Sequence, residues 1–209
     1  MKAFKLMNIS PIVPVIAIDN VEDALPLAQA LSDGGINIME ITLRTPVGLK
    51  AIEIISKEFP SMNVGAGTVC NSDDLIKSKN AGAQFVFSPG ISQELIDAAK
   101  KHEITLIPGV ATSSEVMLAQ NNGLFYCKLF PAVLAGGISI LKAFQGPYSK
   151  MNFCPTGGIS LTNYNEFLAL DNVLCVGGTW IVPKDKIKSG DFSVITQLCK
   201  EALENIQGL

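Results

Sequence analysis

Residues 38–67, IMEITLRTPVGLKAIEIISKEFPSMNVGAG, contain the pattern that decides the fold. Residues 38–43 and 62–67 are short, largely apolar runs, whereas residues 47–59 place apolar side chains at helical spacing with charged ones between them. A strand, a helix and a second strand in this order are typical of a unit whose two strands run parallel. The stretch therefore predicts an α/β protein with a parallel sheet.

The same alternation continues in both directions along the chain. Strands are expected at residues 13–18, 38–43, 62–67, 85–88, 105–108, 125–130, 151–155 and 173–176. Amphipathic helices are expected at residues 21–32, 47–59, 72–80, 93–100, 113–121, 138–144, 162–168 and 192–206. Eight repeats match a closed (β/α)8 TIM barrel, although a doubly wound open sheet shows the same alternation. We expect the barrel.

Length and composition favour one domain over residues 1–209. The chain is too short for two generous α/β domains, and no linker or low-complexity stretch interrupts the repeats. Hydrophobic residues make up 48% of the chain and charged residues only 17%, which suits strands covered by helices on both faces.

Charge and cysteine usage exclude several classes of partner and site. A net charge of -3 provides no basic field for phosphate backbones or anionic lipids, so nucleic acid and membrane partners are not expected. No signal peptide or membrane span is apparent, and a cytoplasmic location is expected. The five cysteines form an odd set without a C-x-x-C pair, which indicates buried free thiols rather than disulfides or metal ligands. The single histidine, His102, lies at a solvated helix end, so no metal site is expected.

Lys128 stands in the middle of the apolar run FYCKLF at residues 125–130. Burial disfavours the charged ammonium form, and a neutral lysine amine is a nucleophile toward carbonyl groups. The alternative is a lysine that extends from the end of the strand to solvent. Lys128 has no acidic residue nearby in the sequence, which suggests that its partner belongs to another strand.

Residues 38–45 supply a candidate partner. Glu40, Thr42 and Arg44 alternate onto one face of the expected strand. A glutamate inside an apolar strand suits a general acid/base, or else a structural ion pair with Lys128 or Arg44. Arg44, the only arginine, could bind a carboxylate with two parallel hydrogen bonds, and a surface salt bridge is its alternative role.

Hydroxyl and glycine residues follow the other expected strands. Thr68 ends GAGT and could orient a carboxylate or keto group, although a helix cap or a turn explains this motif equally well. The last two strands end in the glycine pairs of PTGG and VGGT. Backbone amides of Gly157, Gly158 and Gly178, with the hydroxyl of Thr179 at the start of a short helix, could hold a phosphate. Tight turns that need positive φ are the alternative.

Eight motifs in this order carry a family resemblance: PVI at 14–16, EITLRT at 40–45, VGAGTV at 64–69, FSPG at 87–90, IPG at 107–109, KLFPA at 128–132, FCPTGGIS at 153–160 and CVGGTW at 175–180. Over nearly its whole length the chain resembles the bacterial 2-keto-3-deoxy-6-phosphogluconate (KDPG) and 4-hydroxy-2-oxoglutarate aldolases. These are small class I aldolases with a (β/α)8 fold. Two features depart from the family: threonine stands at 179, where serine is frequent, and the N-terminal helix looks shortened.

The resemblance implies a role for each candidate residue. Lys128 would form a Schiff base with a 2-keto acid, and Glu40 would be the general acid/base. Arg44 and Thr68 would bind the keto-acid end. The resemblance assigns phosphate binding to Gly157, Gly158 and Thr179, and the pocket lining to Pro89, Phe130 and Thr156. It also implies a homotrimer, no metal or organic cofactor, and two small-molecule products, a 2-keto acid and a phosphorylated aldehyde.

Two other functions stay open on the sequence. A sugar-phosphate isomerase on the same barrel would use Glu40 as a base and Lys128 only as an electrostatic stabiliser, without a covalent adduct. A binding protein that retains the fold would show affinity without turnover. The preferred substrate, KDPG or unphosphorylated 4-hydroxy-2-oxoglutarate, is a further alternative within the aldolase hypothesis.

Overall fold

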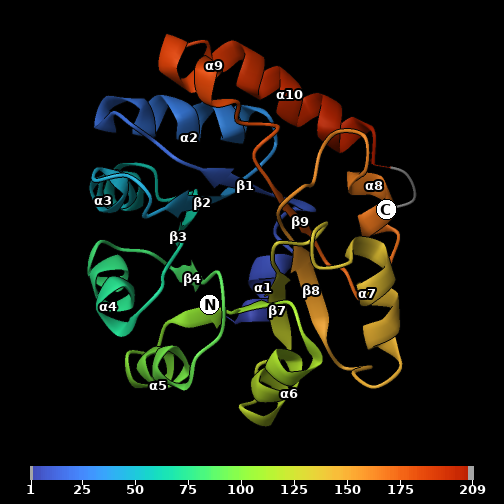
Figure 1. Cartoon of the computed structure of the whole chain (residues 1–209). Helices are drawn as coiled ribbons and strands as arrows, with labels where there is room; N and C mark the ends of the chain where they lie inside the picture. Colours follow the sequence, from blue (N-terminus) through green and yellow to red (C-terminus); the bar gives the residue numbers. More distant parts are fainter. Residues whose placement is uncertain (1, 207–209) are drawn as a thin grey trace.

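The computed structural model describes residues 2–206, in which helices surround a group of parallel strands (Figure 1). Six strands form one curled sheet in the order β5-β4-β3-β2-β1-β9. In chain order they are β1 (Ile12–Ile16), β2 (Ile38–Thr42), β3 (Asn63–Gly67), β4 (Phe85–Phe87), β5 (Thr105–Ile107) and β9 (Val176–Gly178). A second sheet contains β6 (Gly109–Val110), β7 (Tyr126–Leu129) and β8 (Asn152–Pro155).

The two sheets meet at both edges. β5 and β6 are separated only by Pro108, which has no N–H to continue the strand ladder, while its carbonyl accepts a hydrogen bond from the Lys128 N–H at 2.9 Å. At the other edge, isolated parallel bridges join Phe153 to Val173 and Thr156 to Gly177. The predicted parallel α/β architecture is confirmed. The six-stranded sheet is a half-barrel, and the ladder is not one continuous ring of eight strands.

Helices follow the strands around the outside of the sheets (Figure 1). They comprise the 3-10 turn η1 (Val21–Asp23), α2 (Ala24–Asp33), α3 (Gly48–Glu58), α4 (Ser72–Asn80), α5 (Gln93–Lys101), α6 (Ser113–Asn121), α7 (Gly137–Gln145), α8 (Tyr164–Leu168), α9 (Lys184–Ser189) and α10 (Phe192–Glu204). The short helix α1 (Ala3–Met7) lies behind the strands, near the centre of the view in Figure 1, and buries Leu6 and Met7. None of the helices within residues 2–206 has the length and apolar composition needed to cross a bilayer.

Side-chain caps start three helices where the sequence offers oxygen atoms. Asn71 accepts a hydrogen bond from the Asp74 N–H at the start of α4, and Ser92 accepts one at the start of α5. Thr112 and Glu115 form a reciprocal capping box at the start of α6. These caps end the loops that follow β3, β4 and β6, so they set where each loop leaves its strand.

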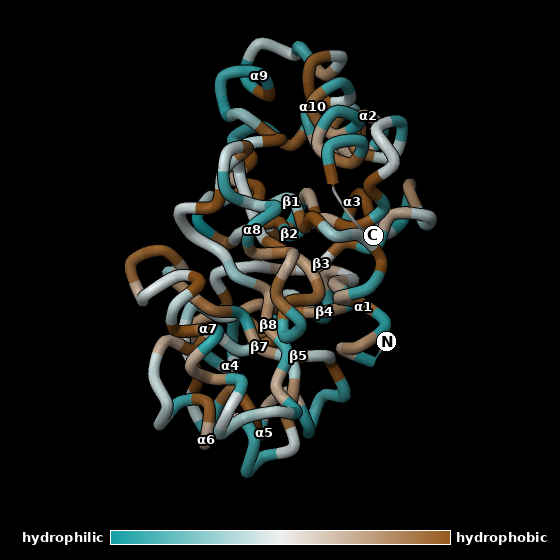
Figure 2. The backbone as a smooth tube through the Cα atoms, turned by 90° about the vertical axis from the view of Figure 1, so that its right-hand side faces the viewer, coloured by the Kyte–Doolittle hydropathy of each residue, from teal (hydrophilic) through white to brown (hydrophobic). Residues whose placement is uncertain are grey.

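Apolar side chains fill the space between the strands and the helices. Every residue of β1, β2 and β4 is buried, and in Figure 2 brown segments, which mark hydrophobic residues, occur among the strands in the middle of the molecule. Strands buried along both faces are typical of a parallel sheet covered by helices. α10 packs on α2, where the Thr196 hydroxyl donates a hydrogen bond to the Ala30 carbonyl at 2.9 Å.

The predicted position of the last strand is wrong. The sequence predicts a strand at residues 173–176 and a glycine loop after it, whereas β9 spans Val176–Gly178. The reason is packing: a methyl group on Gly177 would overlap the Thr156 hydroxyl, and one on Gly178 would overlap the Trp180 ring. Glycine is therefore required here by close neighbours within a strand. The shortened N-terminal helix that the resemblance implied is α1, whereas the separate strand β6 was not predicted.

Candidate active site

One cavity of about 290 Å³ opens at the carboxyl ends of the strands. All eleven candidate residues from the sequence line it, joined by four that were not proposed, namely Val15, Thr42, Ile159 and Gly177. The sequence did contain a signal for Thr42, which shares the alternating face of Glu40 and Arg44 on β2. Val15 and Ile159 belong to the family motifs PVI and FCPTGGIS, but no role was predicted for them.

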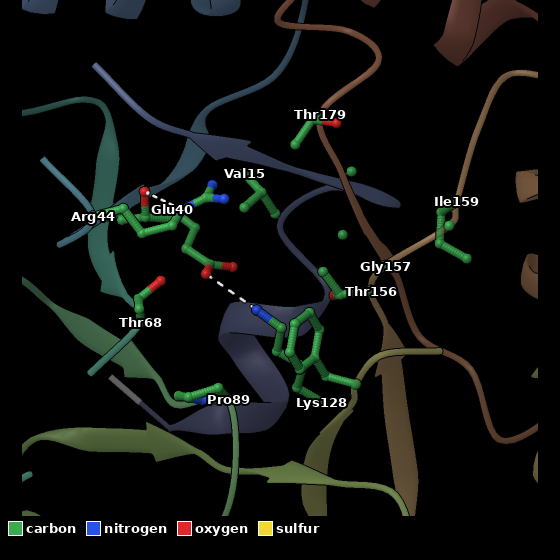
Figure 3. Close-up of a pocket in the computed structure, with 15 residues that line it drawn as sticks. Val15, Glu40, Arg44, Thr68, Pro89, Lys128, Thr156, Gly157, Ile159 and Thr179 are labelled. Atoms are coloured by element: carbon green, nitrogen blue, oxygen red, sulfur yellow. Dashed lines mark hydrogen bonds and ion pairs between the residues drawn. The ribbon is translucent and has the colours of Figure 1, made fainter. Parts of the chain in front are cut away.

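Lys128 and Glu40 form a buried ion pair at the bottom of the cavity. Figure 3 shows the two side chains directed toward each other, with Lys128 Nζ 3.2 Å from Glu40 Oε1. Their side chains are only 6% and 1% exposed. The rings of Phe87 and Phe130 lie on the ammonium group, with centroids 5.4 and 5.1 Å from Nζ. The geometry excludes the alternative in which Lys128 extends to solvent.

Strand register brings these two groups together from positions 88 residues apart in the chain. Glu40 on β2 lies between Val15 of β1 and Gly65 of β3. Lys128 on β7 lies between Gly109 of β6 and Cys154 of β8. The two strands belong to different sheets, so the pair joins the two halves of the strand assembly.

Gly67 provides the space that the Glu40 carboxylate occupies. A Cβ atom at this position would overlap Glu40 Oε1, and the carboxylate carbon would lie 2.7 Å away. No role was predicted for Gly67, because GAGT at residues 65–68 was interpreted only as a motif at the end of a strand. The signal was the glycine itself, at the end of a strand in which a side chain would point inward.

Arg44 and Thr68 lie on one side of the ion pair in Figure 3. Arg44 is exposed, and its Nε–H donates a hydrogen bond to the Thr42 hydroxyl at 3.1 Å. Within residues 2–206 it forms no ion pair, so the surface salt bridge considered from the sequence does not occur. Thr68 has φ of 60°, a left-handed backbone conformation that is rare for a β-branched residue.

Thr156, Gly157 and Thr179 lie on the opposite side in Figure 3. Gly157 and Gly158 have φ of 97° and 81°, the positive values that the alternative of tight turns requires, whereas Gly178 is not among the glycines with positive φ. In the described part of the chain the N–H groups of Gly157 and Gly158 have no hydrogen-bond acceptor. Thr179 was expected at the start of a short helix, which is wrong, because it lies in a turn and α9 begins only at Lys184.

Neither the single histidine nor any of the cysteines lines this cavity. His102 ends α5, as predicted. The five cysteines are free, four of them buried and Cys70 exposed. Burial raises the pKa of the Cys199 thiol to about 12. Between residues 2 and 206, no group of three or more His, Cys, Asp or Glu side chains could hold a metal ion.

Comparison with known proteins agrees with this geometry. The family model for KDPG and KHG aldolase matches residues 4–198. The 2-dehydro-3-deoxy-phosphogluconate aldolase of Dickeya dadantii is 49% identical and covers 96% of this chain, with 94% of its own length matched. The KHG/KDPG aldolase of Escherichia coli K12 is 48% identical, over 97% of this chain and 95% of its own.

A solved structure adds a chemical observation about a relative. The KDPG aldolase of Legionella pneumophila, solved with pyruvate captured at low pH as a covalent carbinolamine intermediate, superposes with a TM-score of 0.95. It is 49% identical, and the match covers 96% of this chain and 98% of that one. By family model, sequence identity and structure, this chain belongs to the KDPG and KHG aldolase family.

Proposed function

We propose that this protein is a class I aldolase that cleaves 2-dehydro-3-deoxy-6-phosphogluconate (KDPG) to pyruvate and glyceraldehyde 3-phosphate through a Schiff base on Lys128. A second activity on 4-hydroxy-2-oxoglutarate, which would give pyruvate and glyoxylate, uses the same steps. The observation that carries the proposal is the Lys128 amine, which is buried, lies near the rings of Phe87 and Phe130 and is 3.2 Å from Glu40 Oε1. The names of the relatives support the substrate.

The first steps make the iminium. Lys128 must be neutral to act as a nucleophile, and Glu40 is close enough to accept its proton. The amine attacks the C2 ketone to form a carbinolamine. Glu40 gives the proton it holds to the carbinolamine hydroxyl, which leaves as water, so that an iminium forms and Glu40 is again a carboxylate. Apolar rings around Nζ exclude water from one side of this centre, which protects the iminium from early hydrolysis.

The iminium then withdraws the electrons of the C3–C4 bond. Glu40, directly or through a water molecule, takes the proton of the C4 hydroxyl as the bond breaks, and the aldehyde leaves. The electron pair forms an enamine on the three-carbon fragment. Glu40 returns a proton to C3 of the enamine, and hydrolysis of the resulting iminium releases pyruvate and restores the Lys128 amine.

The two ends of the substrate would be held on opposite sides of this centre. Arg44 and Thr68 bind the carboxylate, since a guanidinium can make two parallel hydrogen bonds to it. The N–H groups of Gly157 and Gly158, together with Gly178 and the Thr179 hydroxyl, bind the phosphate without a cationic side chain. The remaining pocket residues, Pro89, Phe130 and Thr156, shape the space between the two ends.

We extend the proposal to the whole chain. Residues 1–209 form one domain, in which β5 and β6 are two parts of one barrel strand and the bridges from β8 to Val173 and Gly177 complete an eight-stranded (β/α)8 barrel. The protein assembles as a homotrimer, and association would cover part of the exposed apolar side chains Val133 and Leu134. Five free thiols suit a cytoplasmic location.

The test is reductive trapping. The protein is incubated with pyruvate and sodium borohydride, and the modified residue is located by intact-mass and peptide mass spectrometry. Lys128→Ala removes the amine, and Lys57→Ala, which changes an exposed lysine, is the matched control. A reduced pyruvate adduct on Lys128, absent from Lys128→Ala and present in Lys57→Ala, is the expected result.

Steady-state cleavage of KDPG and of 4-hydroxy-2-oxoglutarate completes the test. Release of pyruvate from KDPG, lost in Lys128→Ala, is expected. Turnover of KDPG by the wild-type protein with Lys128 unmodified by borohydride would refute the Schiff-base mechanism. Sugar-phosphate isomerisation without any adduct would instead favour the isomerase hypothesis.

A further inference from the structure

Thr42 lies between the end of β1 and the side chain of Arg44. It is 1% exposed and lines the cavity on the same face of β2 as Glu40. Its hydroxyl donates a hydrogen bond to the Ile16 carbonyl at 2.8 Å and accepts one from Arg44 Nε at 3.1 Å. A continuous hydrogen-bond chain therefore runs from the Arg44 guanidinium to the backbone of the neighbouring strand.

The direction of this chain is determined by the number of available protons. A threonine hydroxyl has one proton, and that of Thr42 is used by the Ile16 carbonyl. The oxygen can therefore only accept from Arg44, and a guanidinium can only donate. Both partners are thus held in a single arrangement, and the backbone of β1 fixes the orientation of the Thr42 lone pairs.

Arg44 needs such an anchor because nothing else in the described structure holds its head group. The residue is exposed, and no carboxylate pairs with it in residues 2–206. A free arginine side chain of this kind would lose rotamer entropy when it binds a ligand. A hydrogen bond at Nε restricts the side chain before the ligand arrives, which is preorganisation.

On this basis, and resting on the proposed function, we infer that Thr42 is a positioning residue that orients Arg44 for the carboxylate of the 2-keto acid. With Nε–H occupied by Thr42, the N–H groups of the two terminal nitrogens remain free for the ligand. The carboxylate is therefore bound end-on by these two nitrogens. Thr42 itself does not touch the reacting atoms.

Thr45 offers a matched control three residues away. Its hydroxyl donates to the Ile18 carbonyl at 2.6 Å, so it ties the segment that follows β2 to the segment that follows β1. Unlike Thr42, it does not line the cavity and makes no hydrogen bond to Arg44. Thr42→Val and Thr45→Val each remove one hydroxyl and its hydrogen bond to a backbone carbonyl, that of Ile16 at the end of β1 or that of Ile18 just after it, but only Thr42→Val releases the guanidinium.

The first experiment measures borohydride trapping as a function of ketone concentration in wild type, Thr42→Val, Thr42→Ser and Thr45→Val. In Thr42→Val, the half-saturating concentration of pyruvate should rise about tenfold, as expected for a lost hydrogen bond to a charged group. Trapping of hydroxyacetone, a ketone without a carboxylate, should not change. Thr42→Ser keeps the hydroxyl and should restore the pyruvate value, and Thr45→Val should match wild type.

A double-mutant cycle tests whether Thr42 acts through Arg44. In an Arg44→Ala background, adding Thr42→Val should leave the half-saturating pyruvate concentration unchanged, because the group that Thr42 orients is gone. In KDPG cleavage at saturating substrate, kcat of Thr42→Val should stay within about threefold of wild type, so that the loss appears in KM. An equal loss for pyruvate and hydroxyacetone, or an additive loss in the double variant, would overturn the inference.

A second measurement needs no variant of Thr42 to fold. Arg44 is the only arginine, so its Nε–H gives a single arginine side-chain signal in a proton–nitrogen NMR spectrum. Hydrogen exchange of this group should be slower than in free arginine, already without ligand. Exchange as fast as in free arginine would overturn the inference even if pyruvate is trapped. Failure of wild type to trap pyruvate would instead refute the proposed function, and the NMR result would still test the hydrogen bond.

Discussion

At the scale of single residues, Thr68 has a backbone conformation that conflicts with its side chain. A left-handed φ of 60° costs an L-residue about 1–2 kcal/mol, and β-branching adds to the crowding. Such strain persists where the surrounding structure imposes it, often at functional sites. Thr68 lines the cavity beside Arg44, so the strain coincides with the proposed carboxylate site.

Thr68→Gly should therefore raise stability while lowering activity. Glycine adopts positive φ without the steric cost but loses more chain entropy on folding, which leaves a net gain of about 0.5–1 kcal/mol. Urea unfolding measures the stability, and pyruvate release from KDPG measures the activity. Thr68→Ala is the control, because it also loses the hydroxyl but keeps the backbone strain. Its activity should fall without a gain in stability. A Thr68→Gly variant no more stable than Thr68→Ala would contradict this account.

Gly67 is the second residue whose backbone position determines the site. In Gly67→Ala, the new methyl group would push the Glu40 carboxylate away from Lys128. A displacement of about 1 Å at a catalytic group reduces the rate on the order of 100-fold. Steady-state kinetics should show this loss in kcat. Gly90→Ala, where a Cβ meets nothing within 4 Å, should remain fully active, and full activity of Gly67→Ala would show that Glu40 tolerates the shift.

At the scale of elements, the strand ends and helix starts fix the geometry of the cavity. α6 begins with the capping box in which the Glu115 N–H donates to Thr112 Oγ1 at 3.4 Å and the Thr112 N–H donates to Glu115 Oε2 at 2.9 Å. This helix follows β6, which pairs with β7 next to Lys128. The cap thus supports the wall that holds the lysine, without touching the cavity.

Thr112→Ala should lower the free energy of unfolding by about 1 kcal/mol, since it leaves N–H groups of the first turn without their acceptor. Chemical unfolding followed by circular dichroism measures the change. Ser114→Ala, at an exposed position within the same turn, should change stability by less than about 0.5 kcal/mol. Activity at low temperature should be normal in both variants. Equal stabilities for the two would mean that the capping box contributes nothing.

At the scale of the whole molecule, buried thiols make stability depend on alkaline pH. Burial raises the pKa of Cys199 to about 12 and raises that of Cys127 further, from an ordinary value of 9.0. The pKa of Cys175 is also raised, mainly by a hydrogen bond with Cys154 and to a smaller extent by burial. Above about pH 9 the unfolded chain has lost these protons and the folded chain keeps them. The unfolded state then binds fewer protons, so stability falls as pH rises.

Cys199→Ala should make this fall less steep. One thiol with a folded pKa near 12 contributes up to about 1.4 kcal/mol per pH unit between pH 9 and 12. Urea unfolding of wild type and variant at pH 8, 9 and 10 gives the two slopes. Alanine keeps the Cβ that packs against Gly34, so the helix contact is preserved. Parallel slopes would show that the Cys199 thiol does not titrate differently in the two states.

Much of the site could be predicted because charged side chains are energetically costly to bury. Lys128 and Glu40 stand out as charges inside apolar strands, and a buried charge requires a partner or a function. Their pairing and the two phenylalanine rings could not be predicted, because contacts between residues 88 positions apart depend on strand register. For Thr42, the sequence indicated only that it shares one face of its strand with Glu40 and Arg44. Its partners, Ile16 and Arg44, appear once β1 and β2 are aligned.

The errors at the last strand have a similar cause. Glycine pairs are ordinary loop signals, so Gly177 and Gly178 were placed after a strand. In the structure they belong to β9, where the Thr156 hydroxyl and the Trp180 ring occupy the space of their side chains. The same shift leaves Thr179 in a turn instead of at a helix start. Local propensity is overridden where a neighbouring strand supplies the contact.

By itself, the sequence determined the alternation of parallel strands and helices, the helix caps and the set of reactive side chains, because each depends on residues close together in the chain. The tertiary structure decided which of those side chains meet. It placed eleven candidates around one cavity, set Glu40 Oε1 3.2 Å from Lys128 Nζ, and anchored Arg44 to Thr42. The physical reason is that distances across the two sheets follow from strand register and from close packing at residues such as Gly67 and Phe87, which no local pattern specifies.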